Sequence, residues 1–541
     1  MLTREALRKR KRRILWNNDG EDLLLPANYN SPGAEWLRGE YSGCGDMPRR
    51  LETADDLLGQ RMKGKLEGTQ VDGIFYCGYV CAPNWEFPAE NTQALGPDPL
   101  KHVVDYAHAN GMEFFYSFRM NDPHPMLHRG SWTWSQFRLR NLHLLQGRID
   151  REWFEQQFLP WLHGEVEEHP LAPAVAAGKA ALFPQNENPK PTDFRAWAAF
   201  DFGQKEVRDY FLRLVQEACR RYDLDGIELD WGRTPPFFKT QQRANAPVMT
   251  DFVRQTRQWL DQWGRERGKS VLLATRVPNS PAEALNLGLD VAQWLREGSL
   301  DLLVAGFGTK PFSFPIGAWT RLGHAHGVPV FGCIENALPG QSKKEIIRAT
   351  AQRYWDAGAD GVYLFNHFYD DNRNYGQPGQ PARLCPADTL HDIGNPARLR
   401  RLDKTYWVDM FGDDAALPVR LSTECGCSTA IISFEVADDP TEAAQVTLQA
   451  QWAADVDIGR VSLALNDVAL SEGKPFVMQD ESYNEVPWVN RGDAHDLQGW
   501  YAHPVSSLRK GINTLEVSAR PAAIPPDKLL LKQVRLAILY S

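Results

Sequence analysis

The chain has 541 residues, of which 43% are hydrophobic and 24% charged, and its net charge at pH 7 is -9. This composition is typical of a globular protein with two or three domains, and the acidic balance argues against nucleic acid as the main partner. No apolar run of about 18 residues occurs, so no membrane-spanning segment is expected. The N-terminus has no apolar signal-peptide core, which predicts a cytoplasmic chain unless an export signal has been removed.

The eight cysteines form no recognisable set of metal ligands. Cys77 with Cys81, and Cys425 with Cys427, are close in sequence, but neither pair has the further Cys or His residues that a zinc site needs. We therefore expect structural thiols, no metal and no other cofactor.

Eight short apolar runs, each followed by polar residues, alternate with helical segments in the first three quarters of the chain. The predicted strands cover residues 13–16, 71–77, 112–118, 226–230, 271–275, 300–305, 328–334 and 361–365. Helical periodicity predicts helices over 100–109, 205–222, 249–267, 281–297 and 343–357. Continuous apolar strands that alternate with helices are typical of a parallel (β/α)₈ barrel of the TIM type.

The stretch between the third and fourth predicted strands is much longer than one loop and one helix require. We expect an insertion over residues 119–203 within a barrel domain of residues 1–410. Because the insertion follows the C-terminal end of a strand, it should lie on the catalytic face of the barrel. The apolar set between Trp153 and Trp161 is expected to form its core, which leaves Trp132 and Trp134 as the candidates for stacking on a sugar.

After residue 410 helical periodicity disappears and short alternating segments take its place. The predicted strands are 430–436, 444–452, 461–465, 514–519 and 534–540. With turn residues between them, these segments predict an antiparallel β-sandwich accessory domain over residues 411–541.

Residues 222–233, with the sequence YDLDGIELDWGR, predict an active-site strand. Side chains alternate along a strand, so Glu228 and Asp230 share one face, while Trp231 belongs to the other. A carboxylate is costly to bury without partners, so Asp230 at the strand tip suggests contact with solvent, substrate or a cation. Glu228 lies one layer deeper, where a structural pair with an arginine explains it as well as catalysis does.

Polar residues follow most predicted strands, and the C-terminal strand ends of a barrel converge on one face. Glycosidic bond cleavage typically uses two carboxyl groups, and Asp230 and Glu335, from the fourth and seventh strands, are the predicted catalytic pair. The residues predicted to bind a hydroxyl-rich substrate are Asn18, Asp19, Arg119, Asp122, His124, Trp231, Arg233, Arg276, Asn336 and His367.

Structural alternatives exist for several of these residues. Asp230 could form an ion pair with Arg233 or Arg276, Asp19 could stabilise an Asx turn, and His367 could be a core histidine. Asp19, Asp122 and His124 could together contact a metal, but their spacing matches no metal-binding motif.

Two segments carry a family resemblance. Residues 98–119 and 205–230 resemble the second helix, third strand and fourth strand of glycosyl-hydrolase-like family 10 barrels. The resemblance implies a glycosidase-type barrel that acts on a polysaccharide or glycoconjugate, and it singles out Asp230. In the accessory domain, the segments 461–466 and 511–517, with a tryptophan at 500, resemble galactose-binding-like domains, which implies a fold only.

The segment 225–231, DGIELDW, is similar to the fourth-strand signature of family 18 chitinases. In that family the catalytic glutamate stands two residues after the last aspartate, and here Gly232 occupies that position. This departure from the family pattern removes the proton donor, which argues against chitinase-like, substrate-assisted chemistry and in favour of a catalytically inactive barrel.

The leading hypothesis is a glycoside hydrolase with Asp230 as general acid/base and Glu335 as nucleophile or second carboxylate. A carbohydrate-binding protein on a catalytically inactive barrel is the first alternative. A lyase or isomerase for uronic acids, with Arg119, Arg233 and Arg276 holding the substrate carboxylate, is the second.

Overall fold

The computed structural model describes most of both predicted domains. The described residues are 3–24, 51–78, 87, 89–122, 135–163, 165–166, 168, 177, 180–181, 198–233, 235–307, 314–335, 343–365, 367, 387–408, 416–421, 428–452, 461–476, 499–519 and 530–540. The chain falls into two compact units, of which the first consists mainly of Met1–Ala305 and Ala318–Phe331. The second consists mainly of Gly332–Tyr369 and Arg383–Ser541.

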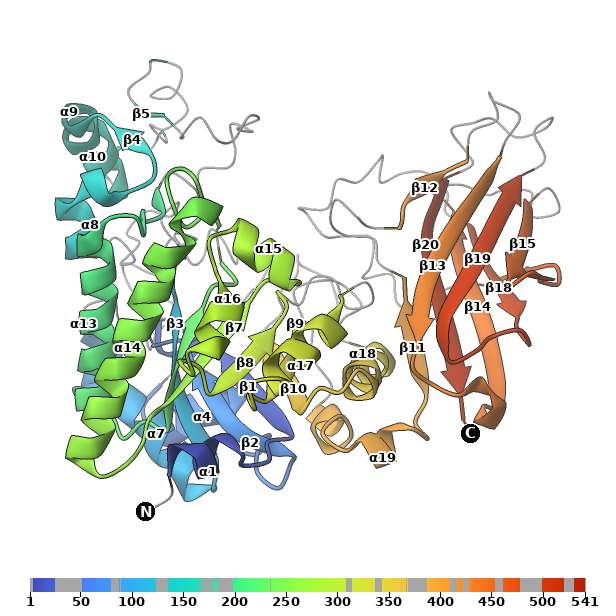
Figure 1. Cartoon of the computed structure of the whole chain (residues 1–541), viewed down its shortest axis with the longest axis horizontal. Coiled ribbons are helices and arrows are strands. Elements are labelled where there is room, and N and C mark those ends of the chain that lie inside the picture. The colour runs from blue at the N-terminus through green and yellow to red at the C-terminus, as the bar shows by residue number, and fades with distance from the viewer. Residues whose placement is uncertain are drawn as a thin grey trace. The chain divides into compact units, whose positions relative to one another are not determined.

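Eight parallel strands close into a barrel in the order β1-β10-β9-β8-β7-β6-β3-β2 (Figure 1). Their bounds are β1 Ile14–Asn18, β2 Val71–Tyr76, β3 Glu113–Arg119, β6 Gly226–Asp230, β7 Leu272–Val277, β8 Leu302–Ala305, β9 Val330–Glu335 and β10 Gly361–Phe365. Every residue of β1, β3, β6, β7, β8, β9 and β10 is buried, as expected for strands covered on both faces. All eight predicted strands and the TIM-barrel fold class are confirmed.

Four predicted helices are confirmed, namely α7 Leu100–Ala109, α13 Lys205–Arg221, α14 Ala246–Arg267 and α18 Lys344–Asp356. The single helix predicted over 281–297 is wrong, because the structure has α15 Pro281–Asn286 and α16 Val291–Arg296 there. Gly288 between them has φ +82°, a conformation that ends a helix, and the Asp290 carboxylate then caps α16. The remaining barrel-region helices are α1 Arg4–Arg8, α2 Glu21–Leu24, α4 Ala54–Arg61, α6 Ala89–Leu95, η4 Arg243–Asn245, α17 Ile316–His324, η5 Ala387–His391 and α19 Pro396–Leu399.

Helices α13 and α14 lie side by side (Figure 1). Val207, Phe211 and Val215 recur every four residues along α13, which gives the helix one buried apolar face. Among the described residues, no helix is both long enough and apolar enough to cross a lipid bilayer.

Short elements fill the described part of the region predicted as an insertion. They are α8 Gln136–Arg140, η2 Leu142–Leu144, β4 Arg148–Ile149, α9 Arg151–Trp153, η3 Phe154–Phe158, α10 Leu159–Leu162 and β5 Ala180–Ala181. Trp153, Phe158 and Trp161 are buried, and the Phe158 ring lies 5.8 Å from the Trp153 ring and 5.4 Å from the Trp161 ring. The aromatic core predicted for this region is therefore confirmed, whereas Trp132 and Trp134 lie outside the described residues.

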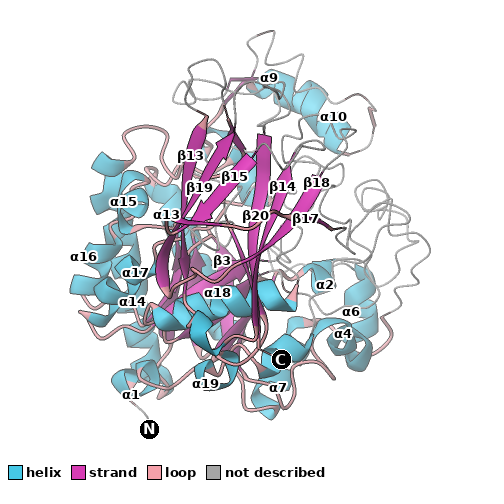
Figure 2. Cartoon of the chain, turned by 90° about the vertical axis from the view of Figure 1, so that its right-hand side faces the viewer, coloured by secondary structure: helices cyan, strands magenta, loops and turns pink. Residues whose placement is uncertain are grey.

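The second unit contains two antiparallel sheets (Figure 2). One sheet has the order β11-β20-β14-β18-β17, with β12 also paired to β20, and the other has the order β13-β19-β15-β16. Their bounds are β11 Lys404–Trp407, β12 Val419–Arg420, β13 Thr429–Val436, β14 Gln445–Trp452, β15 Val461–Leu465, β16 Val468–Ala469, β17 Lys474–Pro475, β18 Gly499–Pro504, β19 Gly511–Ala519 and β20 Leu530–Leu539, and η6 spans Pro440–Glu442.

The two sheets enclose one apolar core. Alternate residues of β13 and β19 are buried, and they join buried residues of β14 and β20 in the same cluster. The predicted β-sandwich is thereby confirmed. The domain boundary expected at residue 410 stays a prediction, although β11, which precedes that residue, already pairs with β20.

A buried charged network lies beside this core. The Lys404 ammonium is 2.8 Å from an oxygen of Asp438, and neither side chain is more than 1% exposed. Tyr406 and Tyr540 donate their hydroxyl hydrogens to the same carboxylate. Burial lowers the pKa of Lys404, and the Asp438 charge counteracts that effect. The network therefore balances one desolvated cation against one desolvated anion.

Asp438→Asn should lower the free energy of unfolding by about 3–5 kcal/mol, because it leaves the buried Lys404 ammonium without its counter-charge. Urea denaturation monitored by tryptophan fluorescence measures the effect. Glu442→Gln, at an exposed carboxylate of the same unit, is the matched control and should change stability by less than about 0.5 kcal/mol. Equal effects of the two substitutions would contradict a stabilising network.

Candidate active site

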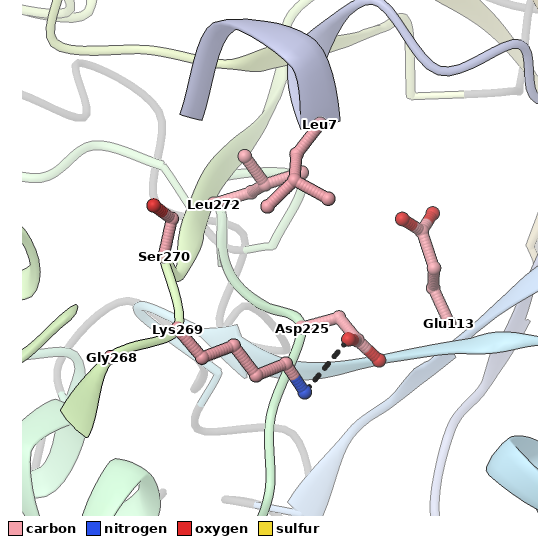
Figure 3. Close-up of a pocket in the computed structure, with 7 residues that line it drawn as sticks. All are labelled: Leu7, Glu113, Asp225, Gly268, Lys269, Ser270 and Leu272. Atoms are coloured by element: carbon pink, nitrogen blue, oxygen red, sulfur yellow. Dashed lines mark ion pairs between the residues drawn. The ribbon is translucent and has the colours of Figure 1, made fainter. Parts of the chain in front are cut away.

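The two aspartates that frame β6 have different surroundings. Asp225 precedes the strand, at the N-terminal end of the barrel, and accepts hydrogen bonds from the Phe114 N–H at 2.9 Å and from Lys269 at 3.0 Å. Burial alone would raise the pKa of Asp225, but these donors and His108 hold it below its ordinary value. Figure 3 shows the ion pair of Asp225 with Lys269, across a pocket from Glu113. Asp225 is thus a structural residue at the face opposite the strand tips.

Asp230, the last residue of β6, is fully buried and forms an ion pair with Arg276. Arg276 is its neighbour in register on β7, and the guanidinium nitrogen lies 3.3 Å from Oδ2. The other oxygen accepts a hydrogen bond of 2.7 Å from the Gly232 N–H. The sequence offered Arg233 and Arg276 as structural partners for Asp230, and the structure pairs Asp230 with Arg276.

Gly232 is required by this ion pair. A Cβ atom at position 232 would lie 2.8 Å from Oδ1 of Asp230 and 2.9 Å from the guanidinium carbon of Arg276. Such distances are too short for any side chain to be accommodated without displacing one of the two charges. A side chain at this position, where family 18 chitinases carry a glutamate, would therefore have to displace the Asp230 carboxylate or the Arg276 guanidinium.

Arg119, the last residue of β3, is the centre of a group of charges. Its guanidinium lies 3.4 Å from Asp122. Burial alone would lower the pKa of Arg119, but acidic groups around it raise the pKa above its ordinary value. These groups are Cys77, Asp122, Asp19 and Asp230. The ends of β1, β3 and β6 therefore bring three carboxyl groups around one guanidinium.

The end of β1 is held by a second arginine. Arg61, at the end of α4, forms an ion pair with Asp19 and donates a hydrogen bond of 2.9 Å to the Asn18 side chain. The amide of Asn18 donates in turn to Asp22 at 2.7 Å, and Tyr76 donates its hydroxyl hydrogen to that aspartate. Asn18 is fully buried, whereas Asp19 retains 6% exposure. Asp19 is thus the more accessible of the two predicted substrate ligands.

Arg61 and Asp22 are two further residues of this site that the sequence pattern did not predict. Arg61 is on a helix rather than at a strand tip, and its position depends on where α4 begins. That start is encoded locally, because Thr53 and Asp56 form a capping box in which each side chain accepts a hydrogen bond from the other residue's N–H. The capping-box sequence could have predicted α4, but not the partner of Arg61.

Trp231 was predicted to contact substrate, and its position contradicts this. The indole is fully buried on the outer side of the barrel wall, where it packs against Phe202 and Phe237 at ring separations of 5.5 and 5.1 Å. The alternation of side chains along β6 explains the difference, because a residue next to the inward Asp230 points outward. Glu228, on the inward side, is fully buried and accepts a hydrogen bond of 2.5 Å from the Ser117 hydroxyl.

The remaining predicted site residues are divided between described and undescribed parts of the chain. Arg233 is half-buried and follows the β6 tip. In the second unit, Glu335 is the last residue of β9 with 4% exposure, and His367 follows β10 and is fully buried. His124 and Asn336 lie outside the described residues.

Two further amides bind loops together above the strand ends. Asn121, two residues after β3, accepts a hydrogen bond of 2.9 Å from the Phe200 N–H. Gln146 donates to the carbonyl oxygens of Phe200 at 3.0 Å and Pro236 at 2.5 Å. The residues that follow β3 and β6 are thereby fixed to one another.

The acidic groups around Arg119 are candidates for acid–base or ionic chemistry. Across the described ranges, no group of three or more His, Cys, Asp or Glu side chains is placed to bind a metal ion. Among the described residues at this end of β1, β3, β6 and β7 there are five carboxyl groups, those of Asp19, Asp22, Asp122, Glu228 and Asp230, and four guanidinium groups, those of Arg61, Arg119, Arg233 and Arg276. This surplus of acidic groups suits a reaction in which positive charge develops on the substrate.

No protein-family model matches the chain, and no curated protein sequence matches it. The expected membership of glycosyl-hydrolase-like family 10 is therefore not confirmed. Among solved structures, a cycloisomaltooligosaccharide glucanotransferase of Paenibacillus sp. is similar over 99% of this chain and 58% of its own length, with 10% identity and a TM-score of 0.33.

An N-acetylglucosaminidase of glycoside hydrolase family 18 from Paenibacillus barengoltzii is similar over 52% of this chain and 66% of its own length, with 14% identity and a TM-score of 0.28. An Anoxybacillus alpha-amylase is similar over 97% of this chain and 100% of its own length, with 11% identity and a TM-score of 0.35. The chain thus spans less than two thirds of the length of the first two proteins. At these identities and TM-scores the likenesses carry no argument about substrate or mechanism.

Gly232→Ala should separate Asp230 from Arg276 and lower the free energy of unfolding by about 1–3 kcal/mol. Urea denaturation at pH 7 measures the change. The matched control is Gly59→Ala in α4, where an added Cβ meets nothing within 4 Å, so the helix should be unchanged or slightly stabilised. A Gly232→Ala variant as stable as wild type would show that the ion pair does not require glycine.

His367 should make stability depend on pH. Burial lowers its pKa from 6.5 to about 3, so only the unfolded chain takes up this proton between those pH values. The unfolding free energy should therefore fall as pH decreases from 6.5 toward 3, and this contribution is complete above pH 6.5. In His367→Gln the fall between pH 7 and pH 5 should be shallower, as measured by urea denaturation at each pH. The exposed His143→Gln is the control, and identical slopes in all three proteins would contradict the assignment.

Proposed function

We propose that this protein is a glycoside hydrolase that cleaves a polysaccharide or glycoconjugate at the C-terminal end of the barrel. The observation that carries the proposal is the convergence of Asp19, Asp122 and Asp230 around Arg119 at the ends of three barrel strands. Glycoside cleavage passes through a transition state with positive charge at the anomeric carbon, which nearby carboxylates stabilise.

The surroundings of Asp230 suggest its role. A backbone N–H and a guanidinium both donate to it, so its hydrogen-bonding partners match a carboxylate that carries its negative charge. Such a group serves as a nucleophile or as a base for water rather than as a proton donor. The proton-donor role then falls to Glu335, the last residue of β9, which reverses the roles assigned from sequence.

Asp19 and Asp122 are the groups proposed to bind sugar hydroxyls. The Asp19 side chain is 8% exposed, the Asp122 side chain is 1% exposed, and the Asp230 side chain is fully buried. Arg119 and Arg276 already face carboxylates of the chain itself, which disfavours a uronate lyase or isomerase that uses these arginines to hold a substrate carboxylate.

Asp230→Asn and Glu335→Gln should each lower kcat by at least about 100-fold, because an ionic or proton-transfer step is removed while the side-chain shape is kept. Reducing-sugar release from a panel of neutral and acidic polysaccharides measures the activity. Asp105→Asn, at an exposed carboxylate on α7, is the control and should retain wild-type kcat. Substantial hydrolysis by both variants would overturn the assignment of these residues.

A carbohydrate-binding protein without hydrolytic activity is the second candidate. It is favoured by the complete burial of Asp230 and by the presence of glycine, not an acidic residue, at position 232 beside it. In calorimetry with the same glycans, sugar binding by a protein that releases no reducing sugar from any of them would support this candidate over the hydrolase.

A further inference from the structure

A basic pocket lies among the short elements that follow β3. Its volume is about 330 Å³, and the described residues that line it include four side chains that are cationic or can become so, and no acidic one. Arg140, His143 and Arg151 come from this region, and Lys239 comes from the segment that follows β6. Leu142 and Ile149 add an apolar surface.

The pocket has a fixed framework. Leu145 pairs with Phe200 through a β-bridge, and Gln146 ties this strand-like segment to Pro236. The N–H of Lys239 donates to Asp201 at 3.2 Å, which fixes the backbone beside the last cation. The same contacts bind the residues that follow β3 to those that follow β6. The pocket is therefore anchored to the segments that leave the strand tips carrying Arg119 and Asp230.

The charges in the pocket contrast with the net charge of the whole chain, which is -9. Arg151 pairs with Glu155 at 3.1 Å, but both side chains are more than half exposed, so this pair holds the guanidinium only weakly. Arg140 and His143 are exposed, and Lys239 is half-buried. Three permanent positive charges around a shallow cavity attract an anion and raise its local concentration.

We propose that this pocket binds an acidic sugar residue, one that carries a carboxylate or a sulfate, and that it belongs to a chain of subsites leading to the proposed hydrolytic site. Only the statement that the pocket belongs to a chain of subsites rests on the proposed function. Guanidinium groups match carboxylate and sulfate oxygens through paired hydrogen bonds. Leu142 and Ile149 offer an apolar surface to the C–H face of the same sugar ring.

The test is calorimetric binding to the full chain carrying Asp230→Asn, which prevents turnover if the protein is a hydrolase. The probes are a trigalacturonate, a heparin-derived hexasaccharide and neutral maltohexaose. We expect at least one acidic probe to bind more tightly than maltohexaose, with an affinity that falls as salt is raised. Binding to the trigalacturonate alone assigns carboxylate recognition, and binding to the heparin hexasaccharide alone assigns sulfate recognition.

Adding Arg140→Gln and Arg151→Gln should weaken acidic-probe binding by tenfold or more. The matched control adds Arg213→Gln and Arg265→Gln, which remove the same charge from exposed positions on α13 and α14 and should leave the affinity unchanged. If both variants lose affinity equally, the effect comes from net charge alone and the pocket is not the binding site. The proposal is also overturned if the acidic probes bind no better than maltohexaose.

The result separates this inference from the proposed function. If acidic probes bind in a way that depends on Arg140 and Arg151, but the protein hydrolyses no glycan, the binding pocket is supported and the hydrolase is contradicted. If the protein hydrolyses only neutral glycans and binds no acidic probe, the hydrolase is supported and the acidic-sugar pocket is contradicted.

Discussion

The buried ion pair between Asp230 and Arg276 constrains the architecture of the candidate site. Neither side chain is more than 1% exposed, so each charge depends on the other for stability. The pair joins register partners on β6 and β7, and a side chain at position 232 would have to displace one of its two charges. Because Asp230 points inward, the adjacent Trp231 points outward into an aromatic cluster with Phe202. One strand end thus places a charge on one side of the barrel wall and a large apolar ring on the other.

The other charges at the strand tips follow the same principle of mutual compensation. Arg119 stands among carboxyl groups from three strands, and Arg61 reaches Asp19 from the end of α4. Asn121 and Gln146 continue this polar framework outward by binding the segments that follow β3 and β6. The proposed hydrolytic site and the basic pocket therefore share a scaffold, although the first is rich in acidic groups and the second in basic ones.

In the second unit, α18 belongs to two layers at once. Its Ile346 joins the apolar core of the sandwich, and its Tyr354 donates a hydrogen bond of 2.8 Å to the Cys333 carbonyl of β9. Arg353 on the same helix binds the Phe314 carbonyl and pairs with Glu435 of β13. These contacts connect α18 to the sandwich on one side and to β9 on the other, within the second unit.

The sequence by itself determined the eight barrel strands, four of the main helices, the sandwich strands and the acidic tip of β6, because periodicity, burial and side-chain alternation are local properties of the chain. It also determined that Trp231 and Asp230 must face opposite ways, although Trp231 was still assigned to the substrate. Only the tertiary structure decided that Arg276 rather than Arg233 pairs with Asp230, that Arg61 holds Asp19, and that Gly232 closes the position after them. The physical reason is that a buried charge is compensated by whichever opposite charge the packing brings near, and residues distant in sequence supply it.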